Sequence, residues 1–351
     1  MDTTTPWTSP GRIGRSRAWR RTVVGTSVTA AIVLAVAGCS STGGKKATQS
    51  QATGKNYTIA MVTHGAPGDT FWDLIRKGAQ AAAAKDNITL KYSSKNSGPD
   101  QATLVQSAID SKVDGLAVTM SFADAIAPTI TSAVKAGIPT VVFNGGINAW
   151  KPTGALAYFG QDEKISGKAA GERLASEGAK KVICIVHEQG SVALEDRCAG
   201  VRDGLLAGSG STPAAPGAGV ENLNVAGTDI PSVESAITAK LQQDPSIDHI
   251  IALGAPFALT AVKSVSAAGS KAKVATFDTN SELVGAIENG SVEWAIDQQP
   301  YLQGYLAVDS LWLYLTNRNT MGGGQPSLTG PSFIDKSNIA AIAEYAKRGT
   351  R

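Results

Sequence analysis

The chain has 351 residues, of which 42% are hydrophobic and 17% charged, a balance typical of a globular protein with a substantial core. The formal net charge of +3 is concentrated in residues 1–39, which hold five arginines and one aspartate. The remainder carries 27 basic and 28 acidic residues, which excludes a basic surface of the kind that binds nucleic acid.

Residues 1–38 are typical of a secretion signal. An arginine-rich segment ends at Arg21 and is followed by the apolar stretch TVVGTSVTAAIVLAVAG, which is too short and too interrupted for a good membrane span. The letters VAGC resemble the lipobox of bacterial lipoproteins, which implies cleavage before Cys39 and acylation of its thiol. A short buried helix followed by an incidental cysteine is the alternative. Residues 39–56 are polar and rich in Gly, Ser and Thr, which predicts a flexible tether on an extracytoplasmic, membrane-anchored lipoprotein.

From Tyr57 onward, short β-branched runs alternate with alanine-rich helical patterns. In the first half, strands are predicted at 57–63, 88–94, 113–119, 138–144 and 155–160, with helices near 70–85, 100–111, 123–136 and 162–177. In the second half, strands are predicted at 181–187, 220–226, 247–253, 273–278 and 292–297, with helices near 192–207, 231–243, 256–268 and 281–289. A long helix at 301–317, a loop and a helix near 336–347 complete the chain. Two such runs predict an α/β protein with two doubly wound parallel sheets.

Unusual polar residues occupy the carboxyl ends of these predicted strands. They are His64, Asn144, His187, Asp278 and the pair Asp297–Gln298. Because ligands of parallel sheets bind at the carboxyl ends of the strands, two facing sheets would form one cleft there.

Once Cys39 is assigned to the lipid, two cysteines remain, Cys184 and Cys198, an even number that allows a disulfide in an exported protein. Cys184 is predicted about 10 Å before the end of its strand, and Cys198 roughly 10 Å along the helix that runs back beside it. We therefore expect a disulfide; two separate buried thiols are the alternative.

The order of the segments IAMVTHGAPGDTFWDLIRKGAQAAA, VDGLAVT, AGIPTVVFN, YFGQDEKISGKAAGERLA, VATFDTN and AIDQQPYLQGYLAVD resembles the type I periplasmic sugar-binding proteins of the ribose/galactose group. The resemblance covers roughly residues 57–345. It implies two lobes joined by three hinge crossings, near 160–162, 298–300 and 330–332. The N-terminal lobe would comprise 57–160 plus 299–330, and the C-terminal lobe 161–298 plus 331–351.

The resemblance also implies a set of ligand contacts. The segment GDTFW matches the one that supplies a polar group and stacked aromatics, here Asp69, Phe71 and Trp72, which suit the hydroxyls and C–H faces of a sugar. The other implied contacts are His64, Asn144, Glu195, Arg197, Asp278 and Gln298. The sequence departs from the family at Gly145, where an arginine is frequent, and at Gly254–Ala255, where the usual Asn-Asp pair is absent.

Each of these residues has a structural alternative. Phe71 and Trp72 could staple the first helix to the sheet, Asp69 could serve only as a helix N-cap, and His64 could be a turn residue. Asn144 and Asp278 could cap turns. Glu195 and Arg197 could pair with each other, and Gln298 could act in the hinge alone. We expect His187 and His249 to be structural.

We therefore expect the solute-binding receptor of an ABC importer, a monomer that binds a small neutral monosaccharide or sugar alcohol and docks on a permease, without a cofactor. The changes at Asn144, Gly145 and Glu195 favour a linear polyol or an unusual monosaccharide. A nucleoside or furanose-like signal molecule is the alternative ligand. A secreted enzyme is disfavoured, because the sequence has no P-loop, no G-x-S-x-G and no Cys/His cluster for a metal. A DNA-binding regulator is disfavoured because a signal and a tether stand where its DNA-binding head would be.

Overall fold

The computed structural model describes residues 55–66, 69–208 and 219–351. The predicted signal peptide, the lipidation site Cys39 and nearly all of the predicted tether lie outside these residues. Among the helices within the described ranges, none combines the length and the apolar character that crossing a membrane requires.

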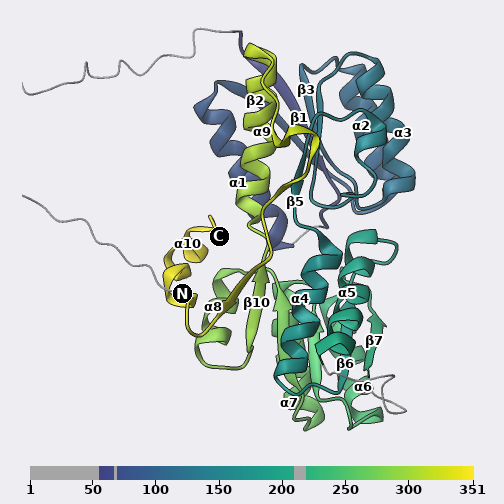
Figure 1. The fold of residues 1–351 in the computed structure, drawn as a ribbon, viewed down its shortest axis with the longest axis vertical. Coiled ribbons are helices and arrows are strands. Elements are labelled where there is room, and N and C mark those ends of the chain that lie inside the picture. The colour runs from purple at the N-terminus through teal and green to yellow at the C-terminus, as the bar shows by residue number, and fades with distance from the viewer. Residues whose placement is uncertain (1–54, 67–68, 209–218) are drawn as a thin grey trace, which may run out of the picture. The chain divides into compact units, whose positions relative to one another are not determined.

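The first lobe is built on a sheet of six parallel strands in the order β11-β5-β4-β3-β1-β2 (Figure 1). Every residue of β3 and β4 is buried, as expected for central strands covered on both faces. The strands are β1 (Tyr57–Thr63), β2 (Ile88–Ser94), β3 (Gly115–Thr119), β4 (Thr140–Phe143), β5 (Tyr158–Gly160) and β11 (Ser327–Leu328). The helices are α1 (Thr70–Lys85), α2 (Gly98–Asp110), α3 (Ala123–Lys135) and α9 (Pro300–Asn317), with short 3₁₀ turns at Lys151–Thr153 and Gly322–Gly324.

The second lobe repeats this plan with a six-stranded sheet in the order β12-β10-β9-β8-β6-β7. Its strands are β6 (Lys181–Val186), β7 (Gly219–Asn224), β8 (His249–Ala252), β9 (Lys273–Phe277), β10 (Trp294–Asp297) and β12 (Ser332–Asp335). Its helices are α4 (Glu163–Ser176), α5 (Val192–Gly208), α6 (Ile230–Gln243), α7 (Ala255–Ala268), α8 (Ser281–Glu288) and α10 (Ala343–Arg348), with a 3₁₀ turn at Ile339–Ala341.

The chain passes between the two sheets three times: between β5 and α4, between β10 and α9, and between β11 and β12. These crossings and the two α/β lobes confirm the predicted fold. Two strands were not predicted. β11 lies in a segment predicted as loop, and β12 pairs antiparallel with β10 because the chain returns from the first sheet beside that edge.

The predicted disulfide is present between Cys184 in β6 and Cys198 in α5, with the two Cα atoms 5.9 Å apart. Both residues are fully buried. The bond therefore ties α5 to β6 of the second sheet, and α5 carries one of the predicted site residues.

Candidate functional site

A pocket of about 260 Å³ lies where the carboxyl ends of strands from both sheets meet. Eight of the nine predicted contact residues line it: His64, Asp69, Phe71, Trp72, Asn144, Arg197, Asp278 and Gln298. Residues scattered over 235 positions of the sequence are thus brought around one hollow. Seven of them follow a strand end or lie at the start of a helix, and Arg197 is the sixth residue of α5.

The first lobe contributes an aromatic wall at the start of α1. The Asp69 carboxylate caps this helix by accepting a hydrogen bond from the Phe71 backbone N–H at 3.0 Å. The cap fixes the first turn, in which the Phe71 and Trp72 rings meet edge to face at 5.1 Å between centroids, and the His64 ring meets Trp72 at 4.5 Å. The cap predicted as an alternative role for Asp69 is therefore real, and the same residue also faces the pocket.

His64 is held as a neutral ring. Its Nδ1 lies 2.6 Å from the Thr119 hydroxyl, and burial lowers its pKa to about 3, with the positive charge of Arg197 acting in the same direction. The pocket therefore has a polar but uncharged imidazole beside its aromatic wall.

Arg197 lies on α5, which packs side by side with α4 in the second lobe (Figure 1). A Cβ atom at Gly167 of α4 would lie 2.1 Å from the Arg197 carbonyl oxygen, so only glycine permits this approach. Arg197 then donates two hydrogen bonds to the carboxylate of Glu163, at 2.5 and 3.1 Å, and one to the Leu253 carbonyl at 3.3 Å. Both charged side chains are at least 96% buried.

Glu163 was not predicted as part of the site. It is the first residue of α4, directly after a crossing between the lobes, and an acidic residue in the first turn of a helix is ordinarily solvent-exposed. Only the tertiary contact with Arg197 distinguishes it.

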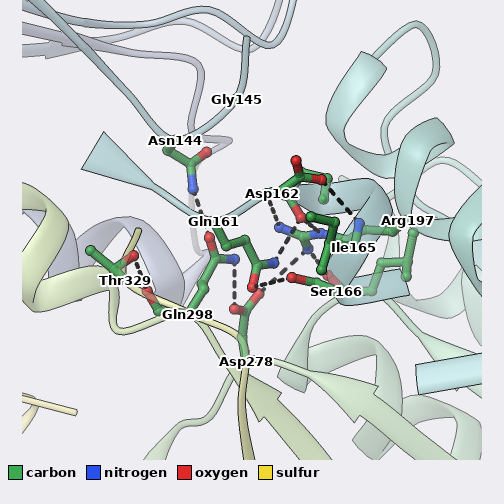
Figure 2. A network of polar contacts seen from close by, with 12 residues as sticks. Asn144, Gly145, Gln161, Asp162, Ile165, Ser166, Arg197, Asp278, Gln298 and Thr329 are labelled. Atoms are coloured by element: carbon green, nitrogen blue, oxygen red, sulfur yellow. Dashed lines mark hydrogen bonds and ion pairs between the residues drawn. The ribbon is translucent and has the colours of Figure 1, made fainter. Parts of the chain in front are cut away.

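A chain of amide and carboxylate groups joins the two lobes at the floor of the pocket (Figure 2). Asn144, at the end of β4, donates from Nδ2 to Gln298 Oε1 at 3.1 Å, and Gln298 donates from Nε2 to Asp278 Oδ1 at 2.8 Å. Asn144 and Asp278 both have left-handed backbone conformations, with φ of 47° and 65°, which Asn and Asp adopt more readily than most residues. Gln298 lies in the crossing between β10 and α9, so this network couples the hinge to both strand ends.

Asp278 is buried, and its pKa rises to about 7 because burial disfavours the carboxylate, even though the Arg197 guanidinium lies 4.0 Å away. Burial also raises the pKa of Glu188 to about 8, reinforced by the negative charge of Asp69. Because Arg197 is already paired with Glu163, the charges around the pocket are largely compensated. This electrostatic balance suits an uncharged ligand.

Three residues that line the pocket have buried polar atoms with no hydrogen-bond partner among the residues that the structure describes. They are Ser121 Oγ, Thr279 Oγ1 and His187 Nδ1. Native proteins rarely leave such atoms unpaired, so these positions point to a guest with several hydroxyl groups. The His187 ring also stacks on Phe257, with 4.0 Å between the ring centroids, which gives the second lobe an aromatic surface in the pocket. His187 was expected to be structural, and Phe257 was not predicted as part of the site.

Glu195 does not line the pocket, which corrects its predicted role. Its side chain is exposed and accepts a hydrogen bond from Asn222 at 3.3 Å. The reason is helical geometry: two residues correspond to about 200° of rotation, so when Arg197 faces inward, Glu195 faces outward. The alternative pairing of Glu195 with Arg197 is excluded by the same geometry.

The departure at Gly145 also has a structural reason. Its φ is 85°, and a Cβ atom there would lie 2.5 Å from the hydroxyl oxygen of Ser121. A side chain such as arginine therefore does not fit this loop, because the Ser121 hydroxyl occupies the space that its Cβ atom would need.

The sequence profile that matches this chain is described as "Periplasmic binding protein domain" and covers residues 59–319. A crystal structure of a carbohydrate transporter from Acidothermus cellulolyticus 11B, in complex with myo-inositol, is 56% identical, covers 85% of this chain and 100% of that chain, and has a TM-score of 0.80. The ribose import binding protein RbsB of Bacillus subtilis is 23% identical over 73% of this chain and 81% of its own length. The xylose/arabinose-binding protein XylF of Sulfolobus acidocaldarius is 25% identical over 68% of this chain, and the match spans 62% of its length, less than two thirds.

Proposed function

The chain belongs to the periplasmic binding protein domain family, and from this premise we propose that it is the extracytoplasmic sugar-binding receptor of an ABC importer, specific for an uncharged cyclic polyol or monosaccharide. The first candidate ligand is myo-inositol, which is bound in the structure that is 56% identical to this chain. The proposed ligand is therefore a cyclic compound, whereas the sequence favoured a linear polyol or an unusual monosaccharide. The C–H face of a ring can lie against an aromatic side chain.

The observation that carries the proposal is the composition of the pocket. Its lining combines the Trp72 and Phe71 rings with the polar side chains of Asn144, Asp278 and Gln298. It also includes three buried polar atoms that have no hydrogen-bond partner among the described residues. A polyol supplies donors and acceptors on every carbon, whereas a charged solute would need an unpaired counter-charge.

Ligand binding would couple to hinge closure. The lobes already touch around the pocket: the Val192 backbone N–H donates to the Ser121 carbonyl at 3.2 Å, and Asn280 lies within 3.5 Å of the Thr70 hydroxyl. A guest that bonds to both lobes stabilises this arrangement over an open one, and the closed form would be the one that docks on the permease.

We further propose that residues 1–38 are a signal peptide and that Cys39 carries a lipid that holds the receptor at the outer face of the cell membrane. The arginine-rich leader and the VAGC sequence support this, as does membership of a family that works outside the cytoplasm.

The test is calorimetric titration of the full-length chain with myo-inositol, sorbitol, ribose, xylose and adenosine. We expect myo-inositol or one of the two pentoses to bind and to be recovered unchanged, as for a receptor rather than an enzyme. Trp72→Ala should weaken binding by at least about 10-fold, equivalent to 1.4 kcal/mol, because it removes a ring face from the pocket.

Trp312→Ala is the matched control, since it removes the same side chain from α9, outside the pocket. Its affinity should equal that of the unmodified chain. Binding of adenosine alone would favour the nucleoside alternative. Absence of binding for every compound, or equal losses in the two tryptophan variants, would refute the proposed site.

A further inference from the structure

The second lobe holds a separate cluster of polar side chains at the end of its sheet that faces away from the pocket. Glu177 is the C-cap residue of α4, His249 is the first residue of β8, and Glu293 directly precedes β10. One oxygen or nitrogen atom from each lies within 4.8 Å of those of the other two. Because the pocket lies at the carboxyl ends of these strands, the cluster is separated from it by the length of β8, about 13 Å.

His249 is oriented as metal-binding histidines are. It is 4% exposed, and its Nδ1 lies 2.8 Å from Asp248 Oδ1. Histidines that bind a metal through one ring nitrogen commonly donate the N–H of the other to a carboxylate. A proton on Nδ1, donated to Asp248, would leave a lone pair on Nε2, the ring nitrogen that faces Glu293.

Two atoms that face each other in the cluster have no hydrogen-bond partner within the described part of the chain. They are His249 Nε2 and Glu293 Oε2, both buried and 4.0 Å apart, too far to bond to each other. Two ligand atoms on one tetrahedral zinc ion lie about 3.4 Å apart, given bonds of about 2.1 Å. A contraction of about 0.6 Å would therefore let one ion satisfy both atoms.

The surrounding charges favour a cation. Glu177 receives the Trp294 indole N–H, at 2.9 and 3.0 Å to its two oxygens, and the Arg173 Nε–H at 3.0 Å. Glu293 binds Lys273 through Oε1 at 2.7 Å, and its Oε2 has no hydrogen-bond partner among residues 55–66, 69–208 and 219–351. With Asp248, three carboxylates thus face two cationic side chains around the imidazole.

We propose that Glu177, His249 and Glu293 bind a divalent first-row transition metal, with Zn²⁺ as the expected ion and water completing its coordination. One imidazole and two carboxylates suit zinc, whereas Mg²⁺ and Ca²⁺ prefer oxygen ligands alone. The ion would fasten the end of α4 to the starts of β8 and β10, and so stabilise the second lobe without taking part in sugar binding.

The experiment measures zinc affinity of the EDTA-treated, tag-free full-length chain by competition with a chromogenic chelator, together with thermal melting. We expect zinc to raise the melting temperature by roughly 4 °C at a concentration about 100 times its dissociation constant, and Mg²⁺ and Ca²⁺ to leave it unchanged. His249→Asn should weaken zinc binding at least 10-fold. His187→Asn, which removes another imidazole of the same lobe, should leave zinc affinity as it was.

Glu293→Gln provides a second variant of nearly unchanged shape, so the proposal can be judged even if His249→Asn fails to fold. It should also weaken zinc binding at least 10-fold while retaining the circular dichroism spectrum of the unmodified chain. The proposal is overturned if the dissociation constant of zinc for the unmodified chain is above 1 mM, roughly the limit of a useful site. It is also overturned if Glu293→Gln binds zinc as tightly as the unmodified chain, or if Mg²⁺ raises the melting temperature as much as zinc does. A loss of zinc affinity in His187→Asn alone would place the ion in the pocket and overturn it as well.

Discussion

Replacing Glu163 by glutamine should destabilise the protein strongly, although the two side chains have nearly the same shape. Glu163 is 3% exposed and holds the Arg197 guanidinium, itself 4% exposed, by two hydrogen bonds. The substitution removes the negative charge and leaves a buried guanidinium without its main counter-ion. Gln161 also donates to Glu163, at 2.7 Å, and a glutamine carbonyl can still accept that bond.

The expected cost follows from the burial of both partners. Removing one member of a buried ion pair typically costs about 3 to 5 kcal/mol, because the remaining charge stays desolvated. Asp278, at 4.0 Å from Arg197, would partly neutralise the guanidinium charge if it ionised. We therefore expect a destabilisation near the lower end of this range. For a folded region of about 300 residues, an unfolding entropy of about 2.1 cal/mol/K per residue converts this cost into a fall of roughly 5 to 8 °C in melting temperature.

The assay is chemical and thermal unfolding followed by tryptophan fluorescence, for Glu163→Gln and for the double variant Glu163→Gln/Arg197→Met. The double variant should be clearly more stable than the single one, because it removes the unpaired charge as well. A loss below about 1 kcal/mol for Glu163→Gln, or a double variant less stable than the single one, would refute the reasoning from an uncompensated buried charge.

Two further predictions concern the titration of the pocket and the attachment of the chain. Burial raises the pKa of Asp278 from 3.8 to about 7, so the folded state keeps this proton up to about pH 7 while the unfolded state loses it above about pH 4. Its contribution to the free energy of unfolding is therefore fully present below pH 4 and is lost as the pH rises to 7. Urea unfolding midpoints measured across this range should show the decline, and Asp278→Asn should reduce the dependence of the midpoint on pH. An unchanged pH dependence in the variant would contradict the raised pKa of Asp278. Cys39→Ser should move the protein from the membrane fraction to the soluble fraction of expressing cells, because acylation needs the thiol, and a variant still sedimenting with membranes would count against the lipid anchor.

Much of the fold was predictable from local sequence patterns. β-branched runs such as residues 57–63 and 113–119 form buried parallel strands because their apolar side chains must be covered on both faces. The strands β11 and β12 could not be predicted, because they flank Gly330 and Pro331 in a segment rich in Ser, Thr, Gly and Pro. They pair only because a neighbouring sheet edge is available.

Site residues that directly follow a strand could be predicted from the sequence more readily than site residues that lie on a helix. His64 and Asn144 follow strands of the first sheet, so the topology of that sheet brings them to one edge, and Asp278 follows a strand at the corresponding edge of the second sheet. The sequence does not fix which way a side chain on a helix points, because this depends on the rotation of the helix about its axis. On α5 this rotation turned Arg197 inward and Glu195 outward.

The sequence by itself determined two α/β lobes, a disulfide and a pocket at the strand ends, because these depend on alternation, residue spacing and strand direction. Only the tertiary structure decided that Glu163 neutralises Arg197, that the amide chain through Gln298 joins the lobes, and that His249 faces Glu293 across a buried gap. These pairings join residues between 20 and 154 positions apart. They arise from the close approach of packed helices and strands, which no local pattern encodes.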